Sequence, residues 1–593
     1  MLERREVIPE RELTPGGELL AEGRRLAQTW RVGPSAFLAA VSEPSEFAYK
    51  RRQMAAGRVM QHGQVGFRDP VKSRRACAEI HEACTAEGVT VDRYGLCLDW
   101  SMGYPPDLRD KRPKGTGMIL RGPEDFAALS AAAPVAPHFG DFVLGFPAAF
   151  ENTQAALAAG STSIGNLGQF FTFRLPHWDD DAALTAATVT ALGLIAGQEV
   201  EVMVHSNLDD GFAALFTDLA CCLGAALIEK HIVEELIGAP LAHCYGHHFS
   251  EPLTRLAFQR ALARVSTTPG TMVYGNTVSY RGGAAANFAS LGSYLLTDIL
   301  AQRRLPSGHA VNPVPVTENR RIPDVEEIVE AQLFAARLIE AAPGHDALLD
   351  TAPADQLADQ IVSGGEVFRD RVLAALQAGG FDTTDPFELL LALRRIGAKR
   401  LEELFGPGAE HPAVPRGRRP LVPATTIREL HEDAERRLAR IAPGTREILG
   451  AARLSALVAT TDVHEHGKLL VEEVLKGLGV AVLDGGISTD PDDLARRARE
   501  TGADLIALST YNGVALSYFE ELKAELARQG LETPILLGGR LNQVPAQSNT
   551  SLPVEVTAEL AAAGAVVCHE VEDAVTTLLA LAEAARVVEN QSG

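Results

Sequence analysis

Near the C-terminus, the types and spacing of three residues would allow one of their side chains to bind a metal or a cofactor. Asp462, His464 and Gly467 spell D-x-H-x-x-G within DVHEHGKLL, which directly follows the apolar run LSALVATT. The same pattern could instead be a polar turn, in which Asp462 caps the next helix and the histidines are solvated. The elements around the motif decide between these interpretations. We expect the second histidine of the stretch, His466, to be a solvated neighbour.

The surrounding segments predict a parallel sheet. Apolar runs of strand length, each ending in small or polar residues, alternate here with segments of helical spacing; the runs are LSALVATT, VAVLDGG, DLIALST, PILLGG and GAVVC. This alternation predicts a doubly wound, flavodoxin-like sheet of five parallel strands. In such sheets ligands bind outside the carboxyl ends of the strands, where DVHEHG, STYNG and GGRLN all fall. The position of the motif therefore favours a binding site.

With these motifs, the C-terminal region resembles the cobalamin-binding domain of B12-dependent mutases and methyltransferases. The resemblance implies that His464 is the lower axial ligand of the cobalt and that Asp462 is its hydrogen-bond partner. A metal-bound imidazole commonly donates its other N–H to a carboxylate, which agrees with this assignment. Gly467 would let backbone pass close to the corrin or to the nucleotide tail of the cofactor.

The resemblance also implies a slot for the nucleotide tail. Ser509 and Thr510 end the third strand, where the family places a serine near the buried benzimidazole. Gly538 and Gly539 match its glycine pair, where a side chain would clash with the tail. This chain departs from the family at Tyr511, where a leucine is frequent, and near the C-terminus, where a Gly-Thr pair is replaced around Cys568 and His569.

Composition limits the partners of the chain. Its net charge of -22 argues against nucleic acid and anionic membrane surfaces, because both require a basic footprint. The N-terminal MLERREVIPE lacks the apolar core of a signal peptide, and we find no apolar run long enough to span a membrane. The seven cysteines form no CxxC pair and are expected to be reduced thiols. These features predict a soluble cytoplasmic protein.

The first four hundred residues alternate more loosely between strand-like and helical segments. FVLGF, STSIGN, EVEVMVHS and TMVYGNT are the candidate strands. Repetition on this scale suits a (β/α)8 TIM-type barrel, although periodicity alone does not separate a barrel from an open sheet. We expect five regions: an N-terminal extension (1–50), a barrel that binds substrate (51–323), a helical extension (324–405), a linker (406–426) and the cobalamin-binding domain (427–593).

Over most of residues 50–405 the sequence resembles the large, barrel-forming subunit of glutamate mutase. The order of several stretches carries this resemblance: VGFRDPVKSRRACAEIHEACTAEGVTVD, AALAAGSTSIGNLGQFFTFRLPHW, HCYGHHFSEPLTRLAFQRALARV and GHAVNPVPVTENRRIPDVEEIVEAQ. It implies an adenosylcobalamin-dependent radical carbon-skeleton mutase, with both subunits fused in one chain and a homodimer formed through the barrel. The cofactor carries the radical chemistry, while the protein orients it and excludes water.

Departures from this family concern the substrate. Glutamate mutases hold two carboxylates with several arginines; Arg68 matches one, and the positions expected for two others hold none. Asn166, Phe173 and His177 stand in the substrate-side loop, where the family has glutamate and tyrosine. We therefore expect a carboxylic acid other than glutamate, with at most one carboxylate or an apolar second end. The nearby aromatics Phe170, Phe171 and Trp178 could add to that pocket or belong to the barrel core.

Other candidates rest on weaker patterns. His309 stands near positions at which the family contacts the adenosyl ribose, and it could hydrogen-bond a ribose hydroxyl. His205, Asn207 and Asp209 follow a predicted barrel strand, where barrel enzymes place catalytic residues. We do not expect a metal in the cluster His243, His247 and His248, since no regular helical pair supports one.

Two alternative functions remain open at this point. A corrinoid methyltransferase would need a methyl-donor site, and no zinc-type Cys/His pattern is evident. A non-catalytic cobalamin sensor or carrier would predict a DNA-binding or helical module in place of the barrel.

Overall fold

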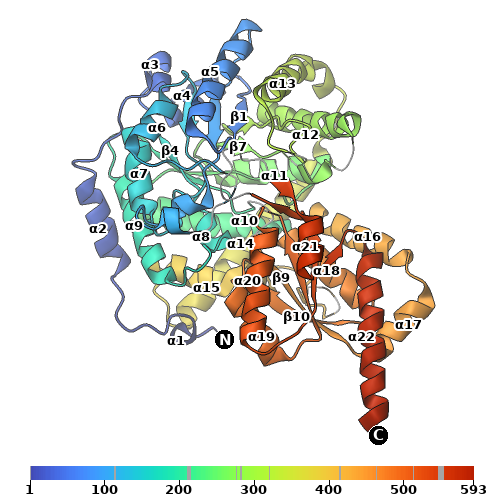
Figure 1. Cartoon of the computed structure of the whole chain (residues 1–593). Helices are drawn as coiled ribbons and strands as arrows, with labels where there is room; N and C mark the ends of the chain where they lie inside the picture. Colours follow the sequence, from blue (N-terminus) through green and yellow to red (C-terminus); the bar gives the residue numbers. More distant parts are fainter. Residues whose placement is uncertain are drawn as a thin grey trace. The chain divides into compact units, whose positions relative to one another are not determined.

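The computed structural model describes residues 2–112, 115, 117–209, 216–275, 277–280, 283–319, 321–412, 414, 416–462, 464–511, 513–544 and 553–592. The chain divides into two compact units (Figure 1). The first unit comprises residues 1–172, 179–210 and 214–426, and the second comprises residues 173–178, 211–213 and 427–593. Each has its own elements and core.

Short parallel strands alternate with helices through the first unit. The strands are β1 (His62–Val65), β2 (Arg93–Leu96), β3 (Ala136–His138), β4 (Ser163–Ile164), β5 (Met203–Ser206), β6 (Leu241–His243), β7 (Met272–Val273) and β8 (Ala310–Val311). The α-helices are α1 (Arg4–Val7), α2 (Gly16–Leu26), α3 (Ala36–Val41), α4 (Glu46–Ala55), α5 (Pro70–Ala86), α6 (Pro123–Ser130), α7 (Ala149–Ala158), α8 (Gln169–Thr172), α9 (Asp181–Ala196), α10 (Leu219–Lys230), α11 (Pro252–Val265), α12 (Ala284–Arg304), α13 (Val325–Asp346), α14 (Ala352–Ala378) and α15 (Pro386–Phe405).

Parallel pairing links these strands in chain order. The hydrogen-bonded groups are β1-β2-β3, β4-β5-β6 and β7-β8. Single parallel bridges extend the pairing, from Tyr245, just after β6, to Val273 of β7, and from Gln61, just before β1, to Val311 of β8. Between β3 and β4, the Nδ1 atom of His138 lies 3.0 Å from the carbonyl oxygen of Ser163.

The expectation of a strand at FVLGF is wrong. Residues 142–146 form bends, and the strand in this region is β3, a few residues earlier. Phe142 and Gly145 adopt positive φ angles of 57° and 80°, which an extended strand does not allow. A Cβ atom on Gly145 would lie 2.6 Å from the backbone nitrogen of Phe170, so the bend is tightly packed. Val143, Leu144 and Phe146 are buried, but through this bend and not through a sheet.

A buried charged group lies between α4 and the strands. Arg93 Nε, at the start of β2, lies 2.9 Å from Glu46 Oε1, and Lys50 Nζ lies 3.7 Å from the same oxygen. Lys50 also donates hydrogen bonds to the carbonyl oxygens of Thr271 at 3.0 Å and Gly308 at 2.8 Å, which precede β7 and β8. Burial lowers the pKa of Lys50 to about 7, against the opposing charge of Glu46. Lys50 thus joins one helix to the start of two strands.

Residues 406–426, which we expected to form a linker, pack within the first unit. The buried carboxylate of Asp218 accepts hydrogen bonds from the backbone nitrogens of Leu421 at 2.8 Å and Val422 at 3.2 Å. Thr426 Oγ1 donates to the carbonyl oxygen of His247 at 2.7 Å. The proline- and arginine-rich composition therefore accompanies an irregular but hydrogen-bonded segment.

The second unit contains the parallel sheet predicted from the sequence. Its strands are β9 (Ser455–Thr460), β10 (Ala481–Gly486), β11 (Leu505–Thr510), β12 (Ile535–Gly539) and β15 (Val566–Cys568), in the order β10-β9-β11-β12-β15, with all neighbours parallel. A short antiparallel pair, β13 (Asn542–Gln543) and β14 (Val554–Glu555), lies outside it. The helices are α16 (Thr425–Ala439), α17 (Pro443–Ala452), α18 (Glu465–Gly477), α19 (Pro491–Thr501), α20 (Ala515–Arg528), α21 (Thr557–Ala563) and α22 (Val571–Ser592).

Helices cover both faces of this sheet. Successive residues of β9 point to opposite faces, as the pleat requires: Leu457 joins the core formed with α19, α20 and α21, whereas Val458 joins the core formed with α16, α17, α18 and α22. The sheet is therefore doubly wound, as the alternating sequence predicts. No helix in the described part of the chain is long and apolar enough to cross a membrane.

Candidate functional site

The loop between β9 and α18 holds the D-x-H pair in a fixed geometry. His464 stands directly before α18, with its side chain 22% exposed. Its Nδ1 atom lies 2.5 Å from Oδ1 of Asp462, and its backbone nitrogen donates to the same oxygen at 3.0 Å. The other oxygen, Oδ2, accepts a hydrogen bond at 2.9 Å from the backbone nitrogen of Tyr511, at the end of β11. One buried carboxylate therefore joins the ends of two neighbouring strands.

The hydrogen bond to Asp462 fixes the tautomer of the His464 imidazole. Burial acts to raise the pKa of Asp462, but the charge and hydrogen bonds of His464 and the Tyr511 amide outweigh it, and the pKa falls below its ordinary value. A carboxylate can only accept, so the Nδ1 atom of His464 carries the shared proton. In the neutral imidazole, the Nε2 atom then keeps its lone pair and can bind a metal.

Small residues pack the neighbouring strand ends closely. A Cβ atom on Gly467 would lie 2.3 Å from Oγ of Ser509, so glycine lets α18 pack against the end of β11. Gly539 has φ +100°, and a Cβ atom there would lie 2.3 Å from the carbonyl oxygen of Thr510. At Gly538 the added Cβ atom would be 3.3 Å from its nearest neighbour. The structure thus gathers the predicted residues of this loop and of both strand ends at one edge of the sheet.

Residues 453–579 match the family described as B12 binding domain. The second unit contains a B12-binding domain. This finding supports the predicted cobalamin cofactor, and its range includes the Asp462–His464 loop.

The B12-binding domain offers a donor set that fits cobalamin. An imidazole nitrogen oriented by a buried carboxylate is a suitable cobalt ligand. Oγ of Ser488 and Oγ1 of Thr510 are buried and have no hydrogen-bond partner among the described residues, so polar atoms of a bound group could pair with them. Both hydroxyls belong to segments at the carboxyl ends of the strands, β10 and β11.

Two residues near His464 were not predicted from the sequence as site residues. The rings of Tyr511 and His464 have centroids 4.2 Å apart at an interplanar angle of 33°. The guanidinium carbon of Arg540 lies 4.4 Å from the centroid of the Tyr511 ring. The sequence contained features that could have identified both residues. Tyr511 stands where the family often has leucine, and Arg540 directly follows the glycine pair.

The first unit has a cavity of about 30 Å³ at the ends of its parallel strands. It is lined by Gln64, Gly95, Leu96, His138, Gly140, Asp141, His205, Asn207, Met272 and Tyr274. Neither lysine nor arginine is among these residues. The volume is enough for about two water molecules or one small polar group.

Two acceptors in this cavity have no partner among the described residues. Nε2 of His138 and Oδ1 of Asn207 are buried and unpaired. Burial lowers the pKa of His138 well below its ordinary value, and the charge of Arg93 acts in the same direction. The imidazole is therefore neutral, and because Nδ1 lies 3.0 Å from the carbonyl oxygen of Ser163, the proton is on Nδ1. A Cβ atom on Gly140 would lie 2.4 Å from Nε2, so glycine keeps the space before that nitrogen open.

Arg68 and Asn166 both lie in the first unit, but their surroundings differ. Nη1 of Arg68, on the segment after β1, is buried and has no hydrogen-bond partner among the described residues. Oδ1 of Asn166 accepts a hydrogen bond at 2.8 Å from the backbone nitrogen of Asn207. Asn166 thus positions a residue that lines the cavity.

His309 does not have the environment expected for a ribose contact. It directly precedes β8, with Nε2 at 2.8 Å from the carbonyl oxygen of His243 and Nδ1 at 2.7 Å from Oγ of Ser307. Both ring nitrogens are therefore engaged within the protein. Packing against Gly270 also encloses the ring, since a Cβ atom there would lie 2.4 Å from it.

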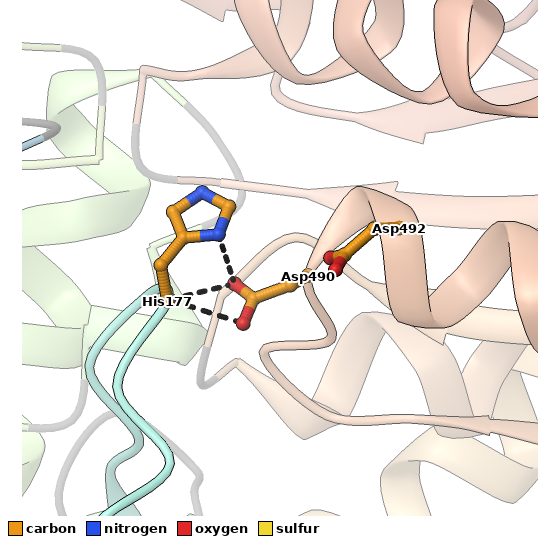
Figure 2. Close-up of side chains that lie close together, drawn as sticks. All are labelled: His177, Asp490 and Asp492. Carbon is orange, nitrogen blue, oxygen red and sulfur yellow. Dashed lines mark hydrogen bonds and ion pairs between the residues drawn. The ribbon is translucent and has the colours of Figure 1, made fainter.

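His177 and Phe173 are grouped with the second unit. The backbone nitrogen of His177 donates hydrogen bonds to both oxygens of the Asp490 carboxylate, at 3.1 and 3.0 Å (Figure 2). Ligand atoms of His177, Asp490 and Asp492 lie within 4.8 Å of one another, as a metal site would require. A guanidinium nitrogen of Arg174, however, is 3.5 Å from Asp490 and supplies the positive charge. We therefore interpret this group as ion pairs that hold residues 173–178.

The other histidine candidates have separate partners. Nε2 of His243 lies 3.2 Å from Glu229, whereas Nδ1 of His248 lies 3.3 Å from Asp209. Asp209 also accepts a hydrogen bond from the backbone nitrogen of His247 at 2.8 Å. In the described ranges the three histidines form no group with metal-binding distances. They stabilise the loops after β5 and β6.

Two aromatics of the substrate-side loop belong to a packed cluster. Phe170 contacts Phe171 with ring centroids 5.9 Å apart, and Phe171 stacks on Phe216 at 6.5 Å. Phe216 in turn contacts Phe368 of α14 at 6.0 Å. This arrangement favours the alternative interpretation of Phe170 and Phe171 as core residues.

A buried arginine, Arg109, which the sequence did not single out, lies near residues 98–107 and 143–152, the segments in which family arginines were expected. Nη2 of Arg109 donates to Oδ1 of Asn152 at 2.7 Å, and Nε donates to the carbonyl oxygen of Tyr104 at 3.1 Å. Burial lowers the pKa of Arg109 to about 10. Its hydrogen bonds give this guanidinium a structural role.

Proposed function

We propose that the chain is an adenosylcobalamin-dependent carbon-skeleton mutase that acts on a small carboxylic acid other than glutamate. The observation that carries the proposal is the cavity of the first unit, in a chain that also has a B12-binding domain. The cavity is small and lined by residues at or just after strand ends, and it would take one polar group of a substrate in an enzyme that must shield a reactive species from water.

A closed (β/α)8 barrel for the first unit belongs to this proposal. The bridges from Gln61 to Val311 and from Tyr245 to Val273 support closure, because they link β8 to β1 and β6 to β7. The cavity would then lie at the carboxyl ends of the barrel strands, the usual place of catalytic sites in this fold.

The polar atoms of the cavity support a specific kind of substrate. His138 Nε2 and Asn207 Oδ1 are hydrogen-bond acceptors without partners among the described residues, so they require a donor such as a hydroxyl or an amino group. Nη1 of Arg68 has no hydrogen-bond partner among the described residues and suits one carboxylate, although Arg68 is not among the described residues that line the cavity. We therefore propose a monocarboxylic acid that carries a hydroxyl or amino group.

The residues divide the work between binding and positioning. In the second unit, His464 would hold the cobalt through Nε2, with Asp462 fixing the proton on Nδ1. In the first unit, His138 and Asn207 would orient the substrate, and Asn166 would hold Asn207 in place. The adenosyl cofactor, when bound, supplies a carbon radical through homolysis of its cobalt–carbon bond.

A substrate screen tests the proposal. The full chain is mixed anaerobically with adenosylcobalamin and with hydroxy, amino and unsubstituted carboxylic acids, and cob(II)alamin formation is followed by absorbance while products are identified by NMR. We expect cob(II)alamin and a rearranged product with a monocarboxylic hydroxy or amino acid. The mutase proposal fails if no acid produces cob(II)alamin, whereas methyl transfer from methylcobalamin to an acceptor would favour a methyltransferase.

A further inference from the structure

The ring of Tyr511 covers one face of His464 in the B12-binding domain. The two ring centroids are 4.2 Å apart and the planes differ by 33°, a tilted stack. The guanidinium carbon of Arg540 lies 4.4 Å from the centroid of the Tyr511 ring, within cation–π range. The side chains from the ends of β9, β11 and β12 thus form a continuous arrangement.

Backbone hydrogen bonds place each member of this stack. The Tyr511 nitrogen donates to Oδ2 of Asp462 at 2.9 Å, the carboxylate that also binds the His464 ring. The Arg540 nitrogen donates to the carbonyl oxygen of Thr510 at 2.8 Å. Gly539 permits that second bond, because at its φ of +100° a Cβ atom would lie only 2.3 Å from the Thr510 oxygen.

We propose that Tyr511, supported by Arg540, is a positioning residue that holds the imidazole plane of His464 ready to coordinate cobalt. The inference rests on the proposed ligation by His464. It adds a second restraint on the ring, independent of the hydrogen bond to Asp462.

Two restraints are needed because one hydrogen bond does not fix a ring. The Nδ1–Oδ1 contact fixes the position of one ring atom, but the imidazole can still rotate about that contact. A stacked aromatic ring opposes this rotation. Metals bind imidazole in the ring plane through the nitrogen lone pair, so a neighbour on the ring face leaves Nε2 available. A ligand that is already oriented loses less conformational freedom on binding, which increases affinity.

Substitutions in the full chain distinguish the effect of the Tyr511 ring from that of the Arg540 cation. Tyr511→Leu keeps apolar bulk but removes the aromatic face, and Tyr511→Phe keeps that face. Arg540→Ala removes the cation, and Arg528→Ala is the matched control, because Arg528 is exposed on α20 and pairs with Glu525. The probe is cob(II)alamin, with its dissociation constant measured by absorbance titration and its axial ligand by the nitrogen superhyperfine splitting in EPR spectra.

We expect Tyr511→Leu to weaken cob(II)alamin binding by about 3- to 10-fold, the range for loss of an aromatic pair. The bound cofactor should also show a mixture of spectra with and without histidine nitrogen splitting. Tyr511→Phe should restore both properties, and Arg540→Ala should show a smaller loss of about 2- to 3-fold. Arg528→Ala should behave as the wild type. A residue with only a structural role would change the melting temperature without changing the histidine-bound fraction.

Three outcomes would overturn the inference. If Tyr511→Leu keeps wild-type affinity and full nitrogen splitting, the stack does not position the ligand, and the ligation proposal stands alone. Tighter binding by Tyr511→Leu would mean that the ring occupies space needed by the cofactor. If the wild type shows no nitrogen splitting, the ligation proposal and the inference both fail.

Discussion

The carboxylate of Asp462 combines two tasks in one side chain. Its Oδ1 atom binds the His464 ring and backbone, and its Oδ2 atom binds the backbone of Tyr511. A cap for α18 alone, the alternative considered from the sequence, would not require the contact with Tyr511. The observed geometry instead links the proposed ligand to its neighbouring strand.

Replacing Asp462 should therefore affect cofactor binding more than folding. We expect Asp462→Ala to weaken cobalamin binding by about 10- to 100-fold, the usual effect of removing the partner of a metal-bound histidine. Absorbance titration of the purified full chain measures this change. A dissociation constant equal to that of the wild type would show that Asp462 serves only as a helix cap.

The stabilisation that the Asp462 carboxylate provides should be lost at low pH. The pKa of Asp462 is lower in the folded protein than in the unfolded chain, so its stabilising effect is present above the unfolded pKa of about 3.9 and is lost as the pH falls through the folded pKa. The stability difference between wild type and Asp462→Ala should therefore shrink below about pH 4.

Site residues could be predicted together from the sequence only where they are close together in the chain. Asp462 and His464 are two positions apart, so the turn after β9 was enough to predict that they meet. His138, on β3, was missed, and Asn207, just after β5, was a candidate only by its position; the two come from distant segments and meet only through strand packing. Likewise, sequence position alone could not show that the ring nitrogens of His309 are already engaged.

At the scale of elements, the sheet of the second unit was predictable because each of its strands falls within one apolar run of the sequence. In the first unit the strands are as short as two residues, and an apolar run can instead form a bend. FVLGF shows this difference, since Phe142 and Gly145 adopt positive φ angles within a buried segment. Hydrophobicity predicted its burial correctly but not its backbone conformation.

Lys50 makes the attachment of α4 sensitive to pH. Its pKa is about 7 in the folded protein because of burial, and about 10.4 in an unfolded chain. Between these values the unfolded chain binds more protons, so the free energy of unfolding should rise with pH. Below about pH 7 the amine is charged in both states, and this contribution should be constant.

Lys50→Met tests this dependence. We expect the stability difference between wild type and variant to increase in favour of the wild type from about pH 7 to about pH 10. Urea unfolding can be followed by tryptophan fluorescence, since Trp30 and Trp100 lie in the first unit. If the free energies of unfolding of the two proteins change with pH in parallel, Lys50 does not have a lowered pKa in the folded protein.

At the scale of the whole molecule, the two units have separate hydrophobic cores. One core in the first unit includes Leu291, Leu295 and Val311, whereas the sheet of the second unit is covered by its own helices. Calorimetry of the full chain should therefore resolve two unfolding transitions.

Cobalamin should raise the temperature of the second unit's transition. At a free concentration of about 100 times the dissociation constant, binding should add about 2.7 kcal/mol to the stability of that unit. In His464→Ala the increase should be smaller at the same cofactor concentration, because axial ligation is lost. A single transition that moves as a whole would contradict independent unfolding.

The contact between Asp462 and Tyr511 also has a consequence during protein synthesis. The ribosome makes residue 462 well before residues 511 and 540, which we propose to orient His464. A nascent chain that ends before β12 has the proposed ligand but lacks part of the set of groups proposed to orient it. We expect cobalamin to be captured only after translation has passed residue 540, which would protect shorter nascent chains from acquiring a reactive cofactor.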